Sequence, residues 1–101
     1  MLYAFVLADR PDSAKLRERE LSAHRAYLAD VSDRMAFAGP LVAEDGLTAV
    51  GSLLVIDFPD LASAQAWLAG EPFTRAGVYA SSRVTAFRNR WPQRAGFPEP
   101  F

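Results

Sequence analysis

The sequence predicts an α+β domain built on a single antiparallel sheet. Short apolar runs of strand length alternate with longer stretches in which apolar residues recur at helical spacing. The resulting order is strand, helix, strand, strand, helix, strand. The length of 101 residues fits one domain with one hydrophobic core.

The first third of the chain predicts a strand and then a helix. Residues 2–7 form an apolar, aromatic-rich run that ends at the turn signal Asp9-Arg10-Pro11-Asp12. From about residue 13 to residue 30, apolar positions recur at helical spacing with charged residues between them. Asp12 or Ser13 is suited to cap this helix.

Two strands are expected in the middle of the chain. Residues 35–42 contain Gly39-Pro40, which predicts a strand interrupted by a kink or a bulge. Residues 51–58 contain Leu53, Leu54, Val55 and Ile56 in a row, and this run gives the strongest strand signal in the sequence.

The last third predicts a helix, a helical turn and a strand. Asp60 is the expected N-cap of a helix that stops at Gly70. Pro72 favours a short helical element over residues 73–77, with Glu71 as its cap. We expect the final strand from about residue 83 to residue 90.

This order of elements is the split βαβ arrangement of ferredoxin-like domains. Right-handed crossovers place both helices on one face of a four-stranded antiparallel sheet. Residues 2–7 and 51–58 are apolar on both faces, so the helix-free face needs a cover. We expect a second copy to supply it, forming a homodimer by sheet-to-sheet packing. This domain is expected to span residues 1–91, followed by a Pro-rich tail at residues 92–101.

Composition excludes several classes of function. The formal net charge is -1, so no global positive field attracts nucleic acid or an anionic membrane. The chain has no cysteine, which excludes disulfides, thiolate catalysis and Cys-ligated metals. No apolar run reaches the roughly 18 to 20 residues that span a bilayer. The N-terminus lacks the basic start of a signal peptide, and we expect a cytoplasmic protein.

The basic and aromatic residues near the C-terminus raise one nucleic-acid alternative, the RRM. Its sheet stacks bases on aromatic side chains of the strands. Residues 51–58, however, lack the leading basic residue and the central aromatics of the RNP1 pattern. We therefore expect no nucleic-acid partner.

His24 is the only histidine, and it falls on the apolar stripe of the first predicted helix. Because the pKa of imidazole lies nearest neutrality, His24 is a candidate for proton transfer. The alternative is a core histidine whose nitrogens bond to the backbone. One histidine with scattered carboxylates gives no metal-ligand spacing, so we expect neither a metal nor a cofactor.

Three further residues are candidates for a site around His24. Arg17 lies two turns earlier on the same helix face and is suited to bind a substrate carboxylate. Ser52, beside a glycine in a predicted strand, is suited to bond a ligand. Glu71 is either a simple helix cap or a carboxylate that orients an imidazole.

Taken in order, these motifs resemble the YCII-related (YciI-like) family. The resemblance runs from Met1 to about Arg90 and implies a dimeric α+β barrel with a site built on a histidine and an acid, here His24 and Glu71. The family usually has aspartate where this chain has Glu71. The segments that carry the resemblance are Met1-Leu2-Tyr3, Arg17 with His24 and Leu28, Ala38-Gly39-Pro40-Leu41, Gly51-Ser52, Ala64-Gln65-Ala66-Trp67, Glu71-Pro72-Phe73 and Ala76-Gly77-Val78-Tyr79.

Some relatives in this family eliminate chloride from chlorinated muconolactone-type or hydroxymuconate-type intermediates of aromatic degradation. The resemblance therefore implies a cofactor-independent lyase or isomerase, in which His24 is the general base and Glu71 fixes its tautomer. Arg17 would bind a carboxylate of the small substrate and Ser52 would help to position it. Two alternatives are a ligand-binding or accessory dimer without turnover, and a structural dimer in which His24 belongs only to the core.

Overall fold

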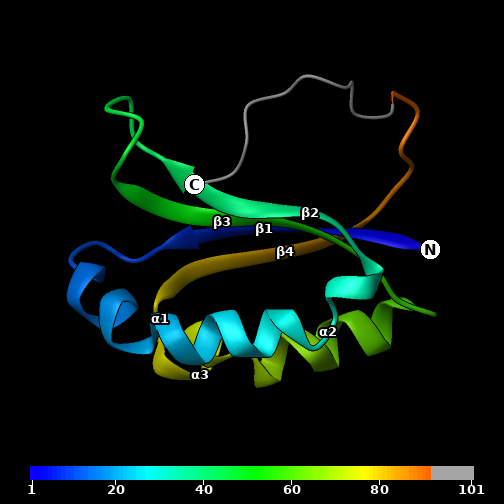
Figure 1. Cartoon of the computed structure of the whole chain (residues 1–101), viewed down its shortest axis with the longest axis horizontal. Coiled ribbons are helices and arrows are strands. Elements are labelled where there is room, and N and C mark those ends of the chain that lie inside the picture. The colour runs from blue at the N-terminus through cyan, green and yellow to red at the C-terminus, as the bar shows by residue number, and fades with distance from the viewer. Residues whose placement is uncertain (92–101) are drawn as a thin grey trace.

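A single antiparallel sheet carries all the helices on one of its faces, as Figure 1 shows for the computed structural model. The structure describes residues 1–91, so the tail predicted for residues 92–101 lies outside the described part. The four strands have the order β2-β3-β1-β4, which confirms the ferredoxin-like prediction. The elements are β1 (Leu2–Asp9), α1 (Ala14–Ala29), a 3-10 turn (Ser32–Arg34), β2 (Met35–Val42), β3 (Ala49–Asp57), α2 (Leu61–Gly70), α3 (Pro72–Ala76) and β4 (Tyr79–Phe87).

Local chemistry accounts for most helix ends. The Asp60 carboxylate accepts a hydrogen bond from the Ser63 backbone N–H at 2.7 Å and caps α2, as predicted. Gly77 ends α3 in the left-handed conformation, with φ of 83°. The predicted side-chain cap of α1 is wrong: Ser13 is the N-cap residue, but its hydroxyl donates to the Arg10 carbonyl instead.

The last strand begins and ends earlier than predicted. We expected residues 83–90, whereas β4 spans Tyr79–Phe87. Because Gly77 reverses the chain directly after α3, the backbone enters the sheet at once and Tyr79 pairs with Asp9 of β1. At the other end Phe87 pairs with Leu2, where β1 itself begins, so no partner strand remains beyond it.

The predicted irregularity of β2 is present, but not at Gly39-Pro40. The register between β2 and β3 shifts near the two ends of β2, between Met35 and Phe37 and between Leu41 and Val42. The centre of the strand pairs regularly, and Gly39 lies opposite Leu53.

The two faces of the sheet have different surroundings. On the helix-covered face, alternate residues of β1 point into the core, and Phe5, which pairs with Leu54, is fully buried. On the open face, large apolar side chains remain exposed, among them Val6 at 44% and Phe37 at 42%. In the described residues, no helix combines the length and the apolar character needed to cross a membrane.

Candidate active site

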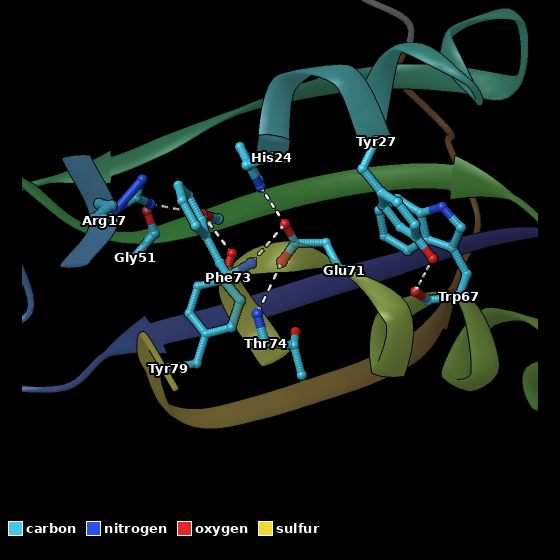
Figure 2. Close-up of polar contacts among 10 residues, drawn as sticks. Arg17, His24, Tyr27, Gly51, Trp67, Glu71, Phe73, Thr74 and Tyr79 are labelled. Atoms are coloured by element: carbon cyan, nitrogen blue, oxygen red, sulfur yellow. Dashed lines mark hydrogen bonds and ion pairs between the residues drawn. The ribbon is translucent and has the colours of Figure 1, made fainter. Parts of the chain in front are cut away.

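His24 and Glu71 meet in the interior between α1 and the start of α3. His24 is 8% exposed and Glu71 is fully buried. The imidazole Nδ1 and the carboxylate Oε1 are joined by a hydrogen bond, as Figure 2 shows. The structure therefore brings together the histidine and the acid that the sequence predicted as partners.

Glu71 is held in place by the helix that it caps. Its carboxylate accepts hydrogen bonds from the backbone N–H of Phe73 at 3.1 Å and of Thr74 at 3.3 Å. Pro72 follows in the first helical position, where no N–H is needed, so the predicted cap is confirmed. The carboxylate thus bonds the first turn of α3 and the imidazole at the same time.

The Glu71 contact defines the tautomer of neutral His24. A carboxylate accepts hydrogen bonds, so Nδ1 carries the proton and the lone pair lies on Nε2. No residue in the described part of the chain bonds to Nε2. The ring also stacks on Phe73, with centroids 3.9 Å apart and planes 7° from parallel. The imidazole is therefore fixed on one side and free to accept a proton on the other.

Arg17 is bonded to the protein at several points. Its Nε donates to Asp9 Oδ2 at 3.0 Å, and its Nη2 donates to the Gly51 carbonyl at 2.7 Å and to Ser52 Oγ at 2.8 Å. The guanidinium also lies 4.7 Å from the centroid of the Phe73 ring, and Figure 2 shows that ring between Arg17 and His24. Arg17 therefore joins β1, β3 and α3 beside the histidine.

Ser52 lies where this network reaches the open space of the site. It is 2% exposed, and its hydroxyl lies 3.3 Å from the Tyr79 hydroxyl as well as accepting from Arg17. Burial raises the pKa of Tyr79, so its hydroxyl stays protonated at neutral pH. Either hydroxyl can be the donor in the Ser52–Tyr79 contact.

Asp9 completes the network and was missed in the sequence. Burial raises the pKa of the Asp9 carboxyl, and this effect outweighs the lowering by Arg17. Its Oδ1 has no hydrogen-bond partner in the described structure. A signal was available: Tyr3, Phe5, Leu7 and Asp9 alternate on β1, and the same period that buries the aromatics turns Asp9 toward the helices.

A cleft of about 250 Å³ opens between α1 and β2. His24 and Ser52 belong to its wall, so the histidine is not sealed in the core. No acidic side chain of the described residues contributes to the wall. The lining residues are Arg17, Leu21, His24, Arg25, Leu28, Ala38, Gly39, Pro40, Ser52 and Leu54.

Within residues 1–91, no three His, Asp or Glu side chains gather closely enough to hold a metal ion. The expectation that the protein works without a cofactor stays a prediction.

Comparisons with known proteins identify the family of this chain and agree with its fold. The family model of the YCII-related domain matches residues 1–88. Protein YciI from Escherichia coli O6:H1 is 36% identical over 97 residues, covering 87% of this chain and 97% of that protein. An uncharacterized protein from Haemophilus influenzae is 32% identical over the same shares of the two chains.

One solved structure is similar over most of its length. It is 5-chloro-2-hydroxyhydroquinone dehydrochlorinase (TftG) from Burkholderia phenoliruptrix AC1100, in complex with 2,5-dihydroxybenzoquinone. The TM-score is 0.81 and the sequence identity is 27%, with 87% of this chain and 94% of that chain covered.

Proposed function

This chain belongs to the YCII-related domain family, and we propose that it is a lyase or isomerase that abstracts a proton from a small, ring-shaped or lactone substrate. His24 is the general base, and Glu71 orients it. The observation that carries the proposal is the pairing of Nδ1 with a buried carboxylate, while Nε2 has no partner among residues 1–91 and His24 belongs to the wall of a cleft.

The geometry supports a simple elimination. Nε2 takes a proton from a carbon next to a carbonyl group, and the electron pair of the broken C–H bond forms a carbon–carbon double bond. A chloride on the neighbouring carbon leaves with its bonding pair, so the net loss is HCl. In an isomerase the same proton returns to a different carbon. Glu71 stabilises the imidazolium that forms in either case.

The surrounding residues support substrate placement. Ser52, whose hydroxyl accepts from Arg17, can donate its O–H to a substrate oxygen when Tyr79 is the donor in the Ser52–Tyr79 contact. Arg17 adds positive charge to the cleft wall and keeps Ser52 in position. The similarity to a dehydrochlorinase that binds a quinone supports a cyclic oxygenated substrate, of the muconolactone, hydroxymuconate or hydroxyquinol kind.

The experiment is a chloride-release assay with a chlorinated muconolactone and with 5-chloro-2-hydroxyhydroquinone, which loses HCl by this step from its diketo tautomer, where the carbon that carries chlorine is saturated. We expect turnover by the wild type and a loss of about 100- to 10,000-fold in His24→Ala, because a positioned base contributes that much. Substrate affinity, measured by calorimetry, should change little. His24→Ala turnover equal to that of the wild type would rule out the base assignment.

The same assay separates the enzyme from a ligand-binding protein. Binding of both compounds without chloride release or isomerisation in the wild type would favour the accessory role. Isomerisation is followed by the ultraviolet spectrum of the lactone.

We also propose that the protein acts as a homodimer through the open face of its sheet. Val6 on β1 and Phe37 on β2 are more than one-third exposed there, although both are large and apolar. A second copy related by a two-fold axis would bury the same face of both sheets.

A further inference from the structure

We propose that Arg25 binds the anionic group of the ligand in the cleft. The inference deepens the proposed function by naming the ligand class, and it rests on that function only in taking the cleft as the ligand site. Arg25 follows His24 directly in the sequence and belongs to the same cleft wall.

The two arginines of the cleft wall, Arg17 and Arg25, differ in whether their guanidinium groups already have partners within the protein. The Arg17 guanidinium faces the Asp9 carboxylate at 3.0 Å and donates two further bonds from Nη2. Much of its charge is therefore compensated inside the protein. Arg25 makes no ion pair and no side-chain hydrogen bond with any residue between 1 and 91.

The position of Arg25 on α1 explains why it has no acidic partner. Side chains three or four positions apart are neighbours on a helix. For Arg25 these neighbours are Leu21, Ser22, Leu28 and Ala29, so α1 supplies no carboxylate within reach.

The wall of the cleft selects a small, flat anion. Among residues 1–91, the wall contains two guanidinium groups and no carboxylate, while Ala38, Gly39 and Pro40 of β2 provide an apolar side without long side chains. A volume of about 250 Å³ suits a single ring. A guanidinium pairs best with a planar group that offers two oxygens, so we assign the ligand to aromatic carboxylates and to the anions of hydroxyquinones.

The test measures binding and does not depend on turnover. The probes are benzoate and 2,5-dihydroxybenzoquinone, which is an anion at neutral pH, together with benzamide and 2,5-dimethoxybenzoquinone as uncharged counterparts. Calorimetry compares the wild type with Arg25→Gln, Arg25→Lys and Arg19→Gln. Arg19 is a matched control because it lies on α1, is bonded to Glu20 and is not in the cleft wall.

We expect Arg25→Gln to raise the dissociation constants of both anions by about tenfold or more, because the variant loses a charge-assisted hydrogen bond. Arg25→Lys should keep part of the affinity, and Arg19→Gln should stay within about twofold of the wild type. The uncharged probes should bind all four proteins equally weakly.

Three outcomes overturn the inference. They are no binding of either anion to the wild type, equal anion affinity in Arg25→Gln, and an equal loss in Arg19→Gln. These outcomes are distinct from a failure of the proposed function. Unchanged chloride release in His24→Ala would contradict the role of His24 as a base, but anion binding could still depend on Arg25. Conversely, anion binding that does not depend on Arg25, together with loss of chloride release in His24→Ala, would contradict the Arg25 site and leave the proposed base in place.

Discussion

Glu71 and His24 are joined by a hydrogen bond across 47 residues of sequence, and the same carboxylate caps α3. The two roles are coupled because a displacement of the carboxylate from the helix start also changes the bond to the imidazole. Placing the acid at a helix N-terminus thus gives the base a fixed partner in a chain that has only one histidine.

We expect Glu71→Ala to lower the free energy of unfolding by about 3 kcal/mol or more. The change leaves His24 Nδ1 and the backbone N–H of Phe73 and Thr74 without their acceptor in the interior. Urea unfolding measures the loss. Asp60→Ala is the control, because Asp60 caps the neighbouring helix α2 at an exposed site and its loss costs about 1 kcal/mol. Equal losses in the two variants would show that Glu71 is only a cap.

Glu71→Gln separates the orienting charge from the cap. The amide oxygen can still accept from the start of α3, but the side chain no longer stabilises an imidazolium. We expect chloride release to fall by about 100-fold or more, with a smaller loss of stability than in Glu71→Ala. Wild-type turnover in Glu71→Gln would argue against a base oriented by this carboxylate.

Gly51 is required by the close approach of β1. A Cβ at this position would lie 2.2 Å from the Leu7 carbonyl oxygen, which is backbone and cannot move independently. We expect Gly51→Ala to lower the free energy of unfolding by about 2 to 3 kcal/mol. The change should also weaken ligand binding, because the Gly51 carbonyl accepts from Arg17.

Gly39→Ala is the matched control on the adjacent strand β2. A Cβ there meets no atom within 4 Å, so the stability should change by less than about 1 kcal/mol. A Gly51→Ala protein as stable as Gly39→Ala would contradict the close approach of β1 to β3.

The fold was predictable because its signals are local. Strand runs, helical spacing and the caps Asp60 and Glu71 depend on neighbours in sequence, and all of them were found. The limits of β4 were wrong because they depend on β1, which lies 70 or more residues away and fixes the pairing of Tyr79 and Phe87. When a distant partner strand determines where a strand ends, the sequence of the strand itself contains little information about those ends.

The site was predictable only in part. His24 is visible as the only histidine. The residues alone left Glu71 as either a helix cap or an orienting carboxylate, and the family resemblance favoured the second role. Asp9 was interpreted as a turn residue, although the alternation along β1 directs its side chain to the helix face. Its role depends on Arg17 reaching across from α1, a tertiary contact that no local pattern records.

The raised pKa of Asp9 gives a pH dependence of stability. Burial holds the pKa of Asp9 in the folded protein above the ordinary value of 3.8. The free energy of unfolding therefore decreases as pH rises from 3.8 to the folded pKa, and it stays lower at higher pH. We expect the stability of Asp9→Asn relative to the wild type to increase with pH over this window. Urea unfolding between pH about 2.5 and 7 measures the difference.

Asp45→Asn serves as a control, because we expect its stability to change with pH in the opposite direction. Hydrogen bonds from Thr48 and Leu47 lower the pKa of Asp45, so its charged form stabilises the fold above pH 3.8, and this contribution is lost as pH falls through the folded pKa. The relative stability of Asp45→Asn should therefore decrease as pH rises. Parallel pH profiles for the two variants would contradict the burial of Asp9.

The open face of the sheet predicts a dimer that a single charge disrupts. Val6 lies at the centre of β1 on this face and is 44% exposed. If a second copy covers it, Val6→Lys buries an unpaired ammonium at the interface, and we expect the dimer dissociation constant to rise by about 100-fold. Light scattering across a micromolar dilution series measures the change.

Leu61→Lys is the matched control for this prediction. Leu61 is 43% exposed, nearly the same as Val6, but it begins α2 in the helical layer on the other side of the sheet. A dimer formed through the open face should tolerate Leu61→Lys and dissociate in Val6→Lys. A wild type that is monomeric at micromolar concentration, or a dimer weakened more by Leu61→Lys, would place the contact elsewhere and leave Val6 and Phe37 exposed to solvent.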